Sequence, residues 1–217
     1  LDNAIYIYNS NTGSYASYVS NGLCTGASTN GGSCNIASQQ AFWVKANAAS
    51  PVLTAVENVK ASADPSFLKQ MNSPNTSPYP MAFSDFPIPL NTNNIPNSLL
   101  LTARGNGYAD ETFIRFMQGA NNDFDGQYDA WKLANTNTNV PNFSSVMNDT
   151  LDFSINSLPL LTSDMHIPIR LTVPLTGTYT ISRDSILMLT SNPCLILEDL
   201  ATGNMIDMLS TISYSFV

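Results

Sequence analysis

The sequence predicts an all-β fold, an antiparallel β-sandwich of the jelly-roll kind built as two packed units. Glu, Lys and Gln, from which exposed helix faces are built, number only 3, 4 and 5 in 217 residues. Asn, Ser and Thr number 25, 25 and 19, and these residues favour turns and strand ends because their side chains bond nearby backbone groups. Short apolar alternations recur between them, as half-buried antiparallel strands require.

The N-terminal part predicts a small β-rich unit. Strands are expected at residues 4–8 and 15–19, joined by a hairpin turn that contains Gly13, and at residues 40–45. Eight of the 13 prolines then fall between Pro51 and Pro96, and proline lacks the amide donor that a central strand needs. We therefore expect two domains: residues 1–98, with an irregular Pro-rich stretch at 51–97, and residues 99–217, an antiparallel β-sandwich.

Strand patterns resume after this boundary at close intervals. Strands at 98–103 and 112–116 are expected on either side of a long hairpin loop at 104–111. Alternating apolar residues and turn residues predict further strands at 128–133, 151–155, 167–173, 177–182, 186–189, 195–199, 205–208 and 212–216.

Composition excludes several classes of function. The chain has 8 basic and 16 acidic side chains, a net charge of −8, so it lacks the basic face that binds the phosphates of nucleic acid. A single histidine, His166, and three cysteines without a C-x-x-C pair do not form the usual zinc or iron–sulfur centres. No glycine-rich phosphate loop and no apolar run of membrane-spanning length occur. We therefore expect neither a nucleic-acid partner nor membrane insertion.

The ends and the cysteines point to an exported protein. The chain begins directly in a strand pattern and ends in another, so we expect an excised, N-terminally truncated piece of a longer polypeptide; the alternative is a mature protein whose terminal strands pair. Cys24 and Cys34 flank a flexible loop and are expected to form a disulfide. Cys194 precedes an apolar run and is expected to be a buried free thiol.

One segment has part of the pattern of a calcium loop. Oxygen ligands occupy relative positions 1, 3, 5 and 9, with Gly126 at position 6, but Lys132 stands where a bidentate Glu belongs. The candidate ligands are Asn121, Asp123, Asp125 and Asp129. Calcium is thus the one cofactor that the sequence proposes, and the alternative is a polar turn leading into the strand at 128–133.

Catalysis is not expected, whereas carbohydrate binding stays open. The neighbouring acids Asp110 and Glu111 would point to opposite faces of a strand, so they do not indicate an acid/base pair. A surface rich in Asn, Ser and Thr offers neutral hydrogen bonds to sugars, and exposed aromatic rings could stack on them. The candidates are Trp43, Trp131 and Tyr128, for which packing in the core is the alternative.

An ordered set of segments resembles a known class of exported proteins. It comprises Asp110-Glu-Thr-Phe-Ile-Arg-Phe116, Phe124-Asp-Gly-Gln-Tyr-Asp-Ala-Trp-Lys-Leu133, Ile155-Asn-Ser-Leu-Pro159, Ile167-Pro-Ile169, Gly177-Thr-Tyr-Thr-Ile181 and Leu197-Glu-Asp-Leu200. In this order they resemble the β-rich region that precedes the C-terminal sorting domain of type IX secretion substrates of Bacteroidota. Residues 5–9, 12–15 and 40–46 resemble the segment that usually comes before it. The resemblance implies an exported, cell-surface or released protein.

The same resemblance implies a modification. Asp149-Thr150-Leu151 and Asp184-Ser185-Ile186 resemble the Asp-Ser/Thr-apolar acceptor of Bacteroidota O-glycosylation. Thr150 and Ser185 are therefore the expected glycan carriers.

Together these observations predict a non-catalytic extracellular β-sandwich module of a larger secreted or cell-surface protein. It would act as a structural, adhesive or assembly element, with neighbouring domains, other surface-protein subunits or glycans as partners. The alternative is a carbohydrate-binding module, and a fragment of a secreted glycan-active enzyme is less favoured.

Overall fold

The computed structural model describes residues 1–54, 56, 95–187 and 194–217, and these residues form strands and no helix. The expected all-β fold is confirmed. The strands are β1 (Ala4–Asn9), β2 (Ser14–Val19), β3 (Ala27–Thr29), β4 (Trp43–Val44), β5 (Ser98–Gly105), β6 (Tyr108–Phe116), β7 (Ala130–Trp131), β8 (Asn142–Met147), β9 (Leu151–Leu158), β10 (Ile169–Thr172), β11 (Tyr179–Leu187), β12 (Ile196–Asp199), β13 (Asn204–Asp207) and β14 (Ser213–Phe216).

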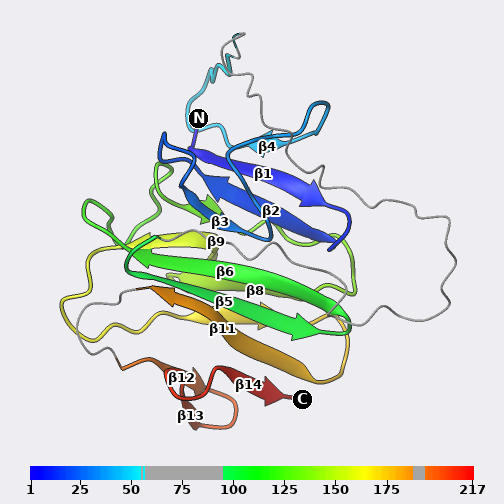
Figure 1. The fold of residues 1–217 in the computed structure, drawn as a ribbon, viewed down its shortest axis with the longest axis vertical. Helices are drawn as coiled ribbons and strands as arrows, with labels where there is room; N and C mark the ends of the chain where they lie inside the picture. The colour runs from blue at the N-terminus through cyan, green and yellow to red at the C-terminus, as the bar shows by residue number, and fades with distance from the viewer. Residues whose placement is uncertain (55, 57–94, 188–193) are drawn as a thin grey trace, which may run out of the picture.

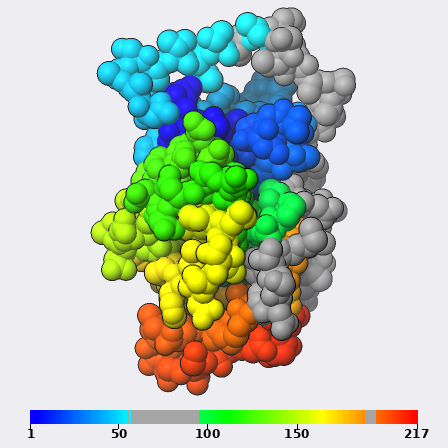
Figure 2. Space-filling view, turned by 90° about the vertical axis from the view of Figure 1, so that its left-hand side faces the viewer, coloured from blue at the N-terminus to red at the C-terminus, as the bar shows by residue number. Residues whose placement is uncertain are grey.

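The strands form three sheets. A four-stranded N-terminal sheet has the order β3-β2-β1-β4, and an eight-stranded sheet has the order β10-β8-β9-β6-β5-β11-β14, with β7 pairing to β9. Strands β12 and β13 form a separate hairpin. The N-terminal sheet packs over the middle of the large sheet, and the β12–β13 hairpin lies at the opposite end of the molecule (Figure 1). Figure 2 shows the same order from another side, with residues 194–217 forming the far end.

Two apolar clusters cover the two faces of the large sheet. The first lies between the sheets and joins Ala4, Tyr6 and Val19 of the N-terminal sheet to Phe113 and Ile155 of the large one. The second is formed on the other face by residues such as Leu101, Ile114, Phe143 and Ile181. The expected division into residues 1–98 and 99–217 thus runs between two sheets that share one core. The Pro-rich stretch at 51–97 lies mostly outside the described residues.

The first hairpin forms as the sequence predicts. Strands β1 and β2 pair antiparallel from Ala4 opposite Val19 to Asn9 opposite Ser14. The turn between them needs Gly13, whose φ is 73° and whose position leaves no room for a Cβ beside Asn137 and Val140.

The second hairpin differs from the expectation of a long loop at 104–111. Strands β5 and β6 continue to Gly105 and Tyr108, so the connection is only Asn106-Gly107, and both of these residues have positive φ, as a type I′ turn requires. The polar residues Asp110 and Glu111 are typical of a loop, and the sequence therefore predicted one. They lie in strand β6 instead, because residues distant in the sequence form hydrogen bonds to their side chains there.

Other elements were missed or had different bounds. Strands β3 and β8 were not predicted, since their small and polar residues lack a clear alternation. The two strands expected at 177–182 and 186–189 form one strand, β11, whose register shifts between Arg183 and Ser185; residues 188–189 lie outside the described part. Strands β6 and β9 pair in parallel, whereas wholly antiparallel pairing was expected.

A close approach in the second hairpin yields a test of the packing. A Cβ at Gly105 would overlap the ring of Tyr179, which is buried. Gly105→Ala should therefore lower the free energy of unfolding by about 1 to 3 kcal/mol, as overpacking does, measured by urea unfolding. Gly107→Asn is the matched control, since Gly107 has open space around it and Asn tolerates its φ of 80°. Equal losses for the two variants would contradict the role given to the Tyr179 contact.

Candidate functional site

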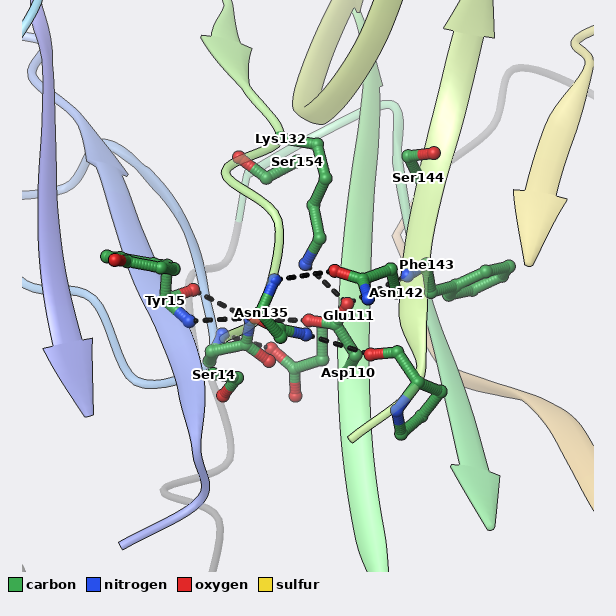
Figure 3. A network of polar contacts seen from close by, with 12 residues as sticks. Ser14, Tyr15, Asp110, Glu111, Lys132, Asn135, Asn142, Phe143, Ser144 and Ser154 are labelled. Carbon is green, nitrogen blue, oxygen red and sulfur yellow. Dashed lines mark hydrogen bonds and ion pairs between the residues drawn. The ribbon is translucent and has the colours of Figure 1, made fainter. Parts of the chain in front are cut away.

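Several ionisable side chains lie close together at the start of β6, next to its turn with β5 and near the N-terminal sheet. Figure 3 shows Lys132 reaching toward Asp110, with Asn135 linking this region to Tyr15 of β2. The side chain of Lys132 is 5% exposed and that of Asp110 is fully buried, and the two form an ion pair. Since burying a lone charge is very costly, each member of this pair stabilises the other in place.

The remaining capacity of the Asp110 carboxylate is also filled. Its Oδ2 accepts the backbone N–H of Phe143 at 2.8 Å, and its Oδ1 accepts a side-chain amide hydrogen of Asn30 at 2.9 Å. Asn30, which follows β3, donates its other amide hydrogen to the carbonyl oxygen of Tyr15 at 2.8 Å. Asn30 therefore ties the N-terminal sheet directly to β6.

Glu111 is held by the same residue on the other side of the strand. The backbone N–H of Asn30 donates to Glu111 Oε2 at 2.5 Å. Burial raises the pKa of Glu111 to about 7, against the lowering effect of this hydrogen bond, and the nearby charges of Asp184 and Asp110 add to the rise. The carboxyl is closed off from solvent and bonded to the main chain, so its role in the structure is to join two elements.

The neighbouring threonine of β6 extends these contacts to two further strands. Thr112 Oγ1 accepts the backbone N–H of Ser145 on β8 at 3.0 Å and donates to the carbonyl oxygen of Phe153 on β9 at 3.2 Å. Side chains of β6 thus satisfy main-chain groups where β8 and β9 separate.

The predicted calcium ligands do not share one centre. Asp129 is buried and its two oxygens accept the backbone N–H groups of Ser157 at 2.7 Å and Asp125 at 2.8 Å. Burial raises the pKa of Asp129 to about 6. Asn121 Oδ1 accepts the N–H of Asp123, and Asp125 Oδ1 accepts the N–H of Gln127.

These contacts make the loop at 121–129 a series of side-chain-stabilised turns. Within the described residues, no group of three or more His, Cys, Asp or Glu side chains is placed to hold a metal ion. Calcium at the four expected ligands stays a prediction.

The predicted sugar-binding aromatics fall into different environments. Trp131 packs against Phe124 and Phe153 at ring-centroid distances of 4.4 and 5.3 Å, and the Lys45 ammonium lies 3.6 Å from its ring centroid. Trp43 is 48% exposed and stands edge-on to Tyr15 at 5.5 Å. Tyr128 is half-buried, and its carbonyl oxygen accepts a hydrogen bond from Arg115. Of the three, Trp43 presents the most open ring.

The state of the three cysteines indicates the kind of cellular compartment in which the protein folds. Cys24 and Cys34 form the expected disulfide, which indicates an oxidising environment outside the cytosol. Cys194 is free, as expected, but it is exposed rather than buried. The described part of the chain contains no helix with the length and apolar character needed to span a bilayer.

The two expected glycan carriers differ in accessibility. Thr150 is exposed in the tight turn between β8 and β9. Ser185 is half-buried within β11, opposite Leu100 of β5. Glycosylation stays a prediction for both, and Thr150 is the more accessible site.

Sequence reasoning missed the residues that organise the region between the sheets. Asn30 and Asn135 stand in polar stretches that resemble ordinary loops, and Lys132 was considered only as a wrong residue in a calcium loop. Their partners lie tens of residues away in the chain. The only local signal was the unusual presence of two acids, Asp110 and Glu111, ahead of an apolar strand pattern.

The fold and these contacts define an all-β domain whose packed sheets are joined by a buried polar network and which carries a disulfide. The chain belongs to a family described as a domain of unknown function, DUF8693, which matches residues 2–217. Comparisons with curated proteins and with solved structures found no match.

The buried ion pair predicts a strong stability effect. Lys132→Met leaves the carboxylate of Asp110 buried without its counter-charge and should cost about 3 to 5 kcal/mol in urea unfolding. The matched control is Arg170→Met, because Arg170 pairs with Asp152 on the surface and its loss should cost about 1 kcal/mol or less. A similar small loss for both variants would show that Lys132 and Asp110 are solvated.

Glu111 predicts a dependence of stability on pH. Its pKa is about 7 in the folded protein against an ordinary value of 4.5, so the native state binds this proton more tightly than the unfolded chain does. The contribution of Glu111 to the free energy of unfolding is therefore largest below pH 4.5 and falls as the pH rises toward 7. The shift corresponds to a change on the order of 3 kcal/mol, with the same sign for Asp129.

Urea unfolding across this pH range measures the effect. Glu111→Gln should flatten the slope, because it removes the titrating group and keeps an oxygen that can accept the N–H of Asn30. An unchanged slope in the variant would contradict the assignment of the titration to Glu111.

Proposed function

We propose that this domain is a non-catalytic module of a larger secreted or cell-surface protein, in which it acts as a structural, adhesive or assembly element. Its partners would be neighbouring domains of the same polypeptide or other surface subunits. The likeness of its segments to the region before the sorting domain of type IX secretion substrates supports export to the outer cell surface or the medium. The disulfide between Cys24 and Cys34 fits such a location.

The observation that carries the proposal is the structural use of the buried ionisable side chains. Asp110 and Glu111 of β6 bond Asn30, which follows β3, and so join the large sheet to the N-terminal sheet, while Lys132 neutralises Asp110 from the segment after β7. Asp129 and Arg115 bond the main chain and side chain of neighbouring segments. Groups used in this way stabilise an interface between sheets, which is what a module under mechanical or proteolytic stress requires.

Carbohydrate binding is the second candidate, favoured by one observation. Tyr8, Tyr15 and Trp43 form a row of rings with centroid distances of 5.3 and 5.5 Å, and Trp43 at its end is half-exposed. An open indole ring is suited to stacking on a sugar.

Delivery of the parent protein tests the structural role. When the parent protein is produced in its own host, Lys132→Met and Gly105→Ala should lower the amount on the cell surface or in the medium. The loss should follow the loss of stability of the domain. Trp43→Ala and Asp123→Asn, which alter exposed side chains, should leave the amount unchanged.

The same variants separate the two candidates. If Trp43→Ala leaves folding and delivery intact but abolishes selective binding on a glycan array, the structural proposal is overturned in favour of a sugar site. Trp131→Ala serves as the comparison, since its ring is packed against Phe124 and Phe153 and its loss acts through stability.

A further inference from the structure

A cleft of about 520 Å³ lies where the chain segment that leads into β1 meets the loop before β7. It brings together residues that are more than a hundred positions apart. Its lining includes the oxygen-bearing side chains of Asp2, Asn3, Asn47, Asp125 and Gln127.

Asp2 is the unusual residue of this cleft. It is 7% exposed, and among the described residues its Oδ2 is buried without a hydrogen-bond partner. Its Oδ1 lies so close to Gly126 that a Cβ there would overlap it. The main chain around Asp2 is fixed, because its own N–H donates to Lys45 O at 3.0 Å and the N–H of Asn3 donates to Gly126 O at 2.7 Å. The carboxylate is thus held in the wall of the cleft rather than turned to solvent.

Within the part of the chain that the structure describes, no cation forms an ion pair with Asp2, although Leu1 also lines the cleft. The Leu1 ammonium donates to Asn47 Oδ1 at 2.8 Å, and the Lys45 ammonium lies over the Trp131 ring. Arg115 is bonded to Ser157 and Tyr128. These described cations are therefore engaged elsewhere.

Further negative charge lies close by. Asp125 lines the same cleft, and its Oδ1 accepts the backbone N–H of Gln127, whereas its Oδ2 accepts no hydrogen bond from the residues that the structure describes. The Tyr6 hydroxyl lies near both Asp2 and Asp129. Burial raises its pKa, and the negative charges of these two residues raise it further. A buried carboxylate beside others of like charge is destabilising unless a cation joins them.

We propose that this cleft binds a divalent cation, and that calcium is the ion it fits. Asp2 and Asp125 supply the two carboxylates, and side-chain amide oxygens of the lining such as those of Asn3 and Gln127 supply neutral ligands. Calcium accepts six to eight oxygen ligands in flexible geometry, whereas magnesium demands a stricter octahedron. Few carboxylates make a weak site, in the range of about 0.1 to 1 mM that extracellular modules show.

This site differs from the loop that the sequence predicts, because it shares only Asp125 with that set of ligands. A bound ion would join the start of the N-terminal sheet to the loop that leads into β7 of the large sheet. Its binding would stabilise the contact between the sheets.

Calorimetry and thermal unfolding with calcium test the site. The wild-type chain should bind calcium with a dissociation constant in the range above. At about 10 mM calcium it should melt several degrees higher than in chelator, since an ion that binds only the native state stabilises it. Magnesium should produce a smaller shift. Asp2→Asn and Asp125→Asn should each weaken calcium binding by about tenfold or more.

Asp123→Asn is the matched control. Asp123 is exposed and belongs to the loop predicted from the sequence but not to the cleft, so this variant should bind calcium as the wild type does. In chelator, Asp2→Asn should melt at or above the wild-type temperature, because it removes an uncompensated buried charge.

Three results would overturn the proposal. One is identical wild-type melts in calcium and in chelator, and another is unchanged calcium affinity in Asp2→Asn. The third is loss of binding in Asp123→Asn, which would place the ion in the 121–129 loop instead.

Discussion

The structure depends on the burial of two adjacent carboxyl groups in one strand. Asp110 and Glu111 point to different sides of β6, and both are removed from water. A single residue, Asn30, bonds both, through its side chain to Asp110 and through its main chain to Glu111. A buried carboxylate without partners costs several kcal/mol. Displacement of β3 and Asn30 from β6 would leave both carboxyl groups without this partner, so it is coupled to unfolding of the surrounding core.

The same constraint explains why the large sheet is irregular at this point. Strand β6 pairs with β9 only from Phe113 to Phe116. Before that segment, Asp110 and Thr112 offer side-chain oxygens to the main chain of β8. The amides of Phe143 and Ser145 are thus satisfied although β6 and β8 are not paired as neighbouring strands. The N-terminal sheet then closes the region from above, with Tyr6 accepting the N–H of Trp131 at 2.9 Å and Ser154 donating to Ser17 at 2.9 Å.

Local patterns in the sequence were sufficient for the fold class, the first hairpin, most strands after residue 150 and the disulfide, because each depends on residues close in the chain. They were insufficient for the second hairpin, where Asp110 and Glu111 look like loop residues until Asn30 and Lys132 are brought to them. They also failed for β8, whose small and polar residues show no clear alternation and whose amides at Phe143 and Ser145 bond side chains of β6 that are distant in sequence. Of the two carboxylates proposed to bind calcium in the cleft, the calcium-loop pattern identified Asp125 but not Asp2, because no local sequence pattern relates two positions so far apart in the chain.

The placement of charge also bears on what the surface can recognise. Only 11% of the residues are charged, and several of them, including Asp2, Asp110, Glu111, Arg115 and Asp129, are buried. In a sequence with so few charges the charged residues would be expected at the surface, where they aid solubility, yet several of them are buried here, and Asp110, Glu111, Arg115 and Asp129 bond separate segments of the chain to one another. Much of the exposed polar surface therefore consists of amide and hydroxyl groups, which form hydrogen bonds without long-range steering, and single apolar side chains such as Leu23 and Leu200 lie among them. If the domain is the module proposed above, its contacts with neighbouring domains would therefore depend on shape and short-range hydrogen bonds more than on ionic attraction.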